Sequence, residues 1–133
     1  VPFELSFYDE SYLTQKSFEE DWNSVRKANT FPVPSGGTTT GAALQTALSE
    51  LILRDEPRKL MIVITDGDTS DFDVLASCYG EAKHAGIEIV SLMIGHPIPI
   101  IQRLAVSVGH PVATHNTCEG IAKYVVKHVL ATI

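Results

Sequence analysis

Two polar segments of this 133-residue chain carry the residue types of a divalent-cation site. Residues 35–41 (SGGTTTG) place three consecutive threonines between glycines. Residues 66–68 (DGD) follow, after Thr65, the continuous apolar run of residues 60–64 (LMIVI). Hydroxyl and carboxylate oxygens are the ligands that hard cations such as Mg²⁺ prefer. The two segments therefore predict an all-oxygen metal site, provided that the fold brings them together. A phosphate-binding loop is excluded, because Ala42 and Ala43 stand where that motif needs Lys and Ser or Thr.

The elements that would position these segments alternate along the chain. Apolar patterning predicts strands over residues 1–8, 60–64, 87–94 and 111–114, with a short additional strand around 11–14. Helices are expected from Ser17, over 41–53, over 72–86, over 99–108 and from Thr117. This order predicts a three-layer, Rossmann-like α/β fold, a mostly parallel sheet with helices on both faces. Ligands of such sheets bind beyond the carboxyl ends of the strands, where both polar segments lie.

Composition excludes several classes of protein. The net charge of −6 disfavours nucleic acid as a partner. No apolar run approaches the ~20 residues that a membrane span needs, so no membrane partner is expected. Two cysteines, Cys78 and Cys118, do not make a disulfide framework and are expected to be buried thiols. Free thiols and the lack of a secretory signal predict a cytoplasmic protein.

The two polar segments also resemble the motifs of a known family. Residues 36–44 (GGTTTGAAL) and then 62–68 (IVITDGD) are similar to the paired motifs of the von Willebrand factor type A (vWA) domain. The similarity covers nearly the whole chain, so residues 1–133 are expected to form a single vWA-like domain. The family's first metal motif, Asp-x-Ser-x-Ser, has no match here. The resemblance therefore implies a domain without its first strand and helix.

That resemblance implies a metal-ion-dependent adhesion site holding Mg²⁺ or Mn²⁺. Thr38 would be a hydroxyl ligand, and Asp66 would be the acidic ligand, acting directly or through water. The residues expected to support the site are Gly37, Thr40, Gly67 and Asp68. Without the first motif, this chain by itself is expected to bind the ion with roughly millimolar affinity, about 4 kcal/mol.

The resemblance further implies a noncatalytic protein-binding domain, whose partner presents a carboxylate to the metal. Free thiols and the acidic composition favour an intracellular vWA protein that works with an ATPase of the chelatase type, with an AAA+ subunit as its partner. The alternative is an extracellular adhesion module. The family's first strand lies between those resembling 1–8 and 60–64. A further segment is therefore expected to pair with both of these strands, because unpaired buried backbone groups are costly.

An enzyme is the third hypothesis. Residues 66–70 (DGDTS) resemble the start of haloacid dehalogenase-type phosphatases, with Asp66 as nucleophile and Asp68 as the acid/base. Such an enzyme needs a later acidic pair for Mg²⁺. The acids that follow Asp73 are Glu81, Glu88 and Glu119, and none is expected at a strand end. The sequence therefore predicts that the chain is not an enzyme.

Overall fold

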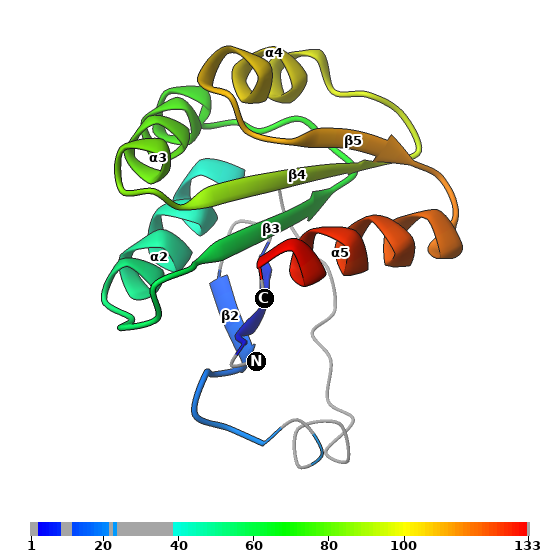
Figure 1. The fold of residues 1–133 in the computed structure, drawn as a ribbon. Helices are drawn as coiled ribbons and strands as arrows, with labels where there is room; N and C mark the ends of the chain where they lie inside the picture. The colour runs from blue at the N-terminus through cyan, green and yellow to red at the C-terminus, as the bar shows by residue number, and fades with distance from the viewer. Residues whose placement is uncertain (1–2, 9–11, 22, 24–38, 133) are drawn as a thin grey trace.

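The computed structural model describes residues 3–8, 12–21, 23 and 39–132 (Figure 1). The described strands are β1 (Leu5–Tyr8), β2 (Tyr12–Lys16), β3 (Leu60–Thr65), β4 (Glu88–Ile94) and β5 (Val112–His115). The helices are α2 (Thr40–Ile52), α3 (Phe72–His84), α4 (Pro99–Val108) and α5 (Cys118–Thr132). The prediction of a helix from Ser17 is wrong at its start, because residues 17–20 form a turn in which the Glu20 amide donates to the Ser17 carbonyl. Most of the remainder of that expected helix lies outside the described residues. None of the described helices combines the length and apolar composition needed to cross a bilayer.

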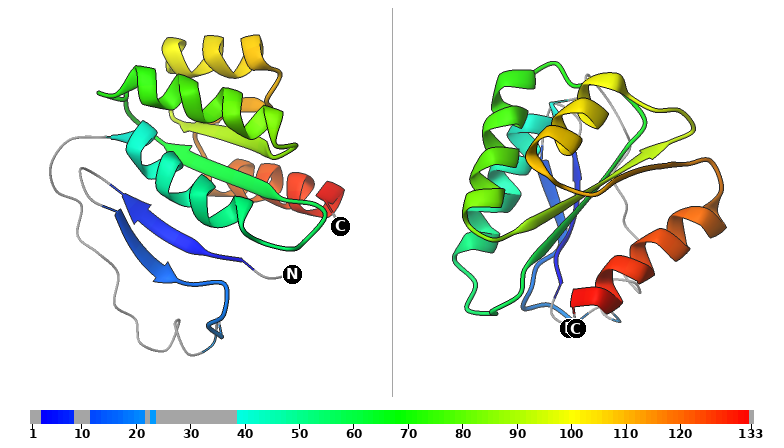
Figure 2. Two further views of the ribbon diagram at one scale, coloured as in Figure 1. Left: turned by 90° about the vertical axis from the view of Figure 1, so that its left-hand side faces the viewer. Right: turned by 45° about the horizontal axis from the view of Figure 1, so that its top comes forward.

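The strands form two sheets. β3, β4 and β5 lie side by side in that order and pair in parallel, with Leu60 opposite Glu88 and Ser91 opposite Val112. β1 and β2 form an antiparallel hairpin. Helices α2, α3 and α4 cover one face of the parallel sheet, and α5 covers the other (Figure 2). The predicted three-layer α/β fold is therefore confirmed.

The core lies between the parallel sheet and the layer formed by α2, α3 and α4. The central strand β4 is buried on both faces from Ile89 to Met93, as its continuous apolar run predicts. The same prediction is wrong for β3. Its buried side chains alternate, and Ile64 is 43% exposed. The reason is that β3 pairs only with β4 among the described strands, while α5 contacts it without covering Ile64.

The prediction for the cysteines is half right. Cys78 is buried in α3, but Cys118 is exposed. Cys118 is the first residue of α5, and the partly buried apolar side chains of that helix begin only at Ile121.

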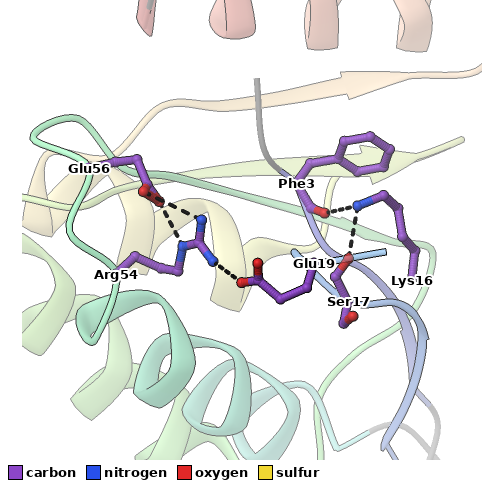
Figure 3. Close-up of polar contacts among 6 residues, drawn as sticks. All are labelled: Phe3, Lys16, Ser17, Glu19, Arg54 and Glu56. Atoms are coloured by element: carbon purple, nitrogen blue, oxygen red, sulfur yellow. Dashed lines mark hydrogen bonds and ion pairs between the residues drawn. The ribbon is translucent and has the colours of Figure 1, made fainter. Parts of the chain in front are cut away.

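Polar contacts fasten the hairpin and the segment that follows it (Figure 3). The Lys16 ammonium is buried and donates to the backbone carbonyls of Phe3 and Ser17, at 2.6 and 2.8 Å. It also lies 4.2 Å from the centre of the Phe3 ring, a cation–π contact. Farther along, the Arg54 guanidinium forms ion pairs with Glu19 and Glu56 at 2.8 and 2.7 Å. Arg54 thus ties the segment after β2 to the turn that precedes β3.

Candidate functional site

Part of each polar segment can be placed in the structure. Asp66, Gly67 and Asp68 directly follow β3, and Thr39, Thr40 and Gly41 lie at the start of α2. Thr38 and Gly37 lie outside the described residues, so their positions stay predictions. The loop after β3 contacts the start of α2 through a residue that the sequence did not single out, Asp71.

Asp71 holds the first turn of α2. One carboxylate oxygen accepts from the Gly41 amide at 2.9 Å and from the Thr69 hydroxyl at 2.5 Å. The other oxygen accepts from the Ala42 amide at 2.7 Å. Partial burial by itself would raise the pKa of Asp71. The hydrogen bonds from Thr69, Gly41 and Ala42 outweigh burial and lower the pKa below its usual value. Asp71 therefore satisfies the free amides of α2 as a carboxylate.

This role was missed because Asp71 immediately precedes α3. The ordinary expectation for an Asp at that position is that it caps its own helix. In the structure its side chain makes no capping hydrogen bond to α3. Two sequence features could have suggested this role: Gly41 at the start of one predicted helix, and Asp71 directly before the next predicted helix. Only the packing of α2 against α3 shows that the two groups meet.

Gly41 permits that packing. A Cβ atom at this position would lie 2.6 Å from the backbone nitrogen of Leu75 and 2.8 Å from the backbone oxygen of Asp71. Both of these atoms belong to the main chain, so they have little room to move. Any side chain at position 41 would therefore push the start of α2 away from α3.

Thr40 connects the same helix end to the hairpin. Its side chain is fully buried, and its hydroxyl lies 3.2 Å from the phenol oxygen of Tyr8, the last residue of β1. Thr40 therefore lies beneath the candidate site and fixes the start of α2 relative to the end of β1.

Asp66 and Asp68 are exposed, and neither forms a hydrogen bond or ion pair with another described residue. The Thr65 side chain stabilises the turn between them. The buried Thr65 hydroxyl accepts from the Gly67 amide at 3.4 Å and donates to the Gly67 carbonyl at 3.3 Å. The two carboxylates are thus presented at the sheet edge with no internal partner in the described part of the chain.

The carboxylate oxygens of Asp66 and Asp68 are suitable ligands for a hard divalent cation. Two carboxylates do not make a full set of ligands. Within the described residues, no group of three or more His, Cys, Asp or Glu side chains is arranged to hold a metal ion. Mg²⁺ usually keeps several waters and takes one or two carboxylates. The described residues supply that anionic part of a site, and further ligands would have to come from water or from residues outside the description.

Among similar proteins of known sequence are the vitrins. The chain is 37% identical to mouse vitrin over 84 residues and 36% identical to human vitrin over 84 residues. Each match covers 62% of this chain but only 12% of the vitrin. Among solved structures, manganese-loaded TRAP protein of Plasmodium vivax superposes with a TM-score of 0.67 at 17% identity. That match covers 92% of this chain and 55% of TRAP and shows a shared fold.

These relatives correct the predicted location. The vitrins are extracellular proteins, so the prediction of a cytoplasmic protein is wrong. The argument failed because two cysteines without a disulfide framework fit either compartment.

The relatives also leave the predicted AAA+ ATPase partner without support. A family model shows the family, and its match is longer than the 84-residue match to vitrin. The family model described as von Willebrand factor type A domain matches residues 6–100, a stretch that contains both polar segments of the candidate site. The chain belongs to the von Willebrand factor type A domain family.

Proposed function

We propose that this chain is a noncatalytic protein-binding module of the extracellular adhesion type. In this proposal a divalent cation at the carboxyl end of β3 receives a carboxylate of the partner protein. The observation that carries the proposal is the contact of Asp71 with the start of α2. This contact joins the loop that follows the DGD turn to the helix that follows the threonine segment, and Asp66 and Asp68 are exposed in that loop. The similarity to vitrins and to manganese-loaded TRAP supports it.

In this proposal Thr38 and Asp66 are the metal ligands. Gly67 lets the turn approach the ion, while Gly37, Thr40 and Asp68 support the site. Residues 66–73 contain four Asp and no Lys or Arg, so without a cation this edge repels an acidic partner. Bound Mg²⁺ or Mn²⁺ would supply positive charge and a coordination position for the partner's carboxylate.

The proposal includes the organisation of the domain. We propose that residues 1–133 act as one vWA domain, in which a further strand lies between β1 and β3. Among the described residues β1 pairs only with β2, and β3 pairs only with β4, which supports this arrangement. Such a strand would satisfy the backbone groups at both edges.

Manganese-induced broadening of amide NMR signals tests the metal site, because it detects millimolar binding. Mn²⁺ should broaden the signals of Gly67 and Gly41 in the wild type, and Mg²⁺ should reverse the effect. Asp66→Ala should abolish the broadening, because a hard ion loses its anionic oxygen. Asp73→Ala is the matched control: it removes an exposed carboxylate from the first turn of α3 and should leave the broadening unchanged.

Unchanged broadening in Asp66→Ala would refute the assigned ligand. A second measurement addresses function: partners captured from extracellular-matrix extract should be lost with EDTA. Phosphatase turnover of a simple aryl phosphate that depends on Asp66 would instead assign the protein to the enzymes.

A further inference from the structure

The outer surface of α3 and α4 exposes apolar side chains that no described element covers. Phe72 is 41% exposed, Ile100 is 37% exposed and Val106 is 66% exposed. α4 lies next to α3 at the outer end of the helical layer (Figures 1 and 2). We call this the α3–α4 surface; its residues are Phe72, Pro97, Ile100, Arg103, Leu104 and Val106.

Two adjoining hollows open on this surface, and Arg103 lines both of them. One, of about 290 Å³, also includes Phe72, Ile100 and Leu104. The other, of about 660 Å³, also includes Pro97 and Val106. Both hollows are shallow and open to solvent, and most of each lining is apolar. An apolar side chain of a partner can therefore lie against this surface beside a group that contacts Arg103.

Arg103 is the charged residue that distinguishes the α3–α4 surface. It is the sole charged residue of α4, in a protein whose net charge is −6. Its Nε donates to the Pro99 carbonyl at 3.3 Å, and no carboxylate of a described residue lies within ion-pair distance. By contrast, Arg54 is held by two glutamates. A guanidinium beside exposed apolar side chains matches a carboxylate through its planar fork of donors.

We infer that the α3–α4 surface binds an acidic segment of a partner protein, with a carboxylate on Arg103 and an adjacent apolar side chain in the hollow beside Phe72, Ile100 and Leu104. Nucleic acid does not fit, since a single cation would face many phosphates on an acidic protein.

The inference extends the proposed protein-binding function and rests on it. Phe72 directly follows Asp71, so the α3–α4 surface adjoins the edge that carries Asp66. A single acidic partner can therefore contact both places, with one carboxylate at the proposed metal and another on Arg103. The contact with Arg103 needs no metal, and this difference separates the two claims by experiment.

Selection of random peptides on the immobilised chain in EDTA tests the inference. Chelation removes metal-dependent binders. The selected peptides should combine Asp or Glu with a neighbouring aliphatic or aromatic residue. Arg103→Ala should weaken them by at least about tenfold, the loss expected for a hydrogen bond between charged groups. Arg103→Lys should restore part of the affinity, because it keeps the charge and loses the fork.

Two matched controls separate the possible outcomes. Lys123→Ala also removes one exposed positive charge, but from α5 on the other face of the sheet, and should keep the affinity. Asp66→Ala should not weaken the binding either, since these peptides bind without metal and the change removes a neighbouring negative charge. Circular dichroism checks that each variant folds, and Arg103→Gln serves as a second variant.

Peptides without acidic residues, or affinities that Arg103→Ala does not change, would overturn the inference while leaving the metal site standing. A dimer detected by analytical ultracentrifugation that Arg103→Ala dissociates would also overturn it, in favour of a second copy. If Mn²⁺ fails to broaden the NMR signals of the wild-type protein, that result would count against the proposed function and not against the contact with Arg103.

Discussion

Replacing Gly41 with Ala tests whether the contact between α2 and α3 organises the candidate site. In an isolated helix this change is favourable, because Ala has the higher helix propensity by about 1 kcal/mol. In the folded protein the added Cβ would lie 2.6 and 2.8 Å from main-chain atoms of Leu75 and Asp71. One helix must therefore move, and the hydrogen bonds that the Gly41 and Ala42 amides donate to Asp71 lengthen or break.

The expected magnitude follows from these two effects. Inserting a methyl group into a packed contact costs about 1–3 kcal/mol. Losing one of the two amide hydrogen bonds to the Asp71 carboxylate costs about 1.5–3 kcal/mol. After subtracting the propensity gain, we expect the free energy of unfolding to fall by about 3 kcal/mol. That loss is large for a domain with a net stability of ~5–15 kcal/mol.

Urea unfolding followed by circular dichroism measures the change. Gly80→Ala is the matched control, because Gly80 is also helical but a Cβ there would meet no atom within 4 Å. It should raise the free energy of unfolding by about 1 kcal/mol. If Gly41→Ala is as stable as the wild type, or if both variants shift stability in the same direction, the reasoning is refuted.

Two other substitutions test polar side chains, the partly exposed Glu50 and the buried His110. A hydrogen bond with Glu4, together with burial and the Glu4 charge, raises the pKa of Glu50 to about 7. The folded protein thus keeps a proton that the unfolded chain releases, so the free energy of unfolding should fall as pH rises from 4.5 to 7. Glu50→Gln should flatten this fall in urea titrations, and an unchanged slope would contradict the shared proton. His110 accepts from the Ile89 amide at 3.1 Å and lies 2.9 Å from the Tyr79 carbonyl, both buried contacts. His110→Ala should cost about 3 kcal/mol in thermal or urea unfolding, because two buried backbone groups lose their partners; a loss below about 1 kcal/mol would argue against this.

The sequence alone was sufficient for the family and for most of the secondary structure of the described residues. The strand predicted over residues 87–94 matches Glu88–Ile94, and the helix predicted over 99–108 matches Pro99–Val108. These elements were predictable because burial on both faces requires a continuous apolar run, and because Pro and Gly mark helix ends locally. The two polar motifs identified the vWA family, which the family model confirms over residues 6–100. The metal ligands Thr38 and Asp66 stay predictions.

Only the tertiary structure showed which groups meet. Sequence placed Asp71 before α3, but the packing of α2 on α3 turns its carboxylate to the amides of Gly41 and Ala42. The same packing requires a glycine at position 41, and the end of β1 buries Thr40 beneath the site. The apolar pattern of β3 gave no sign that Ile64 would be exposed. Periodicity and capping residues describe a single element, whereas these outcomes depend on the distance between elements far apart in the chain, which no local pattern encodes.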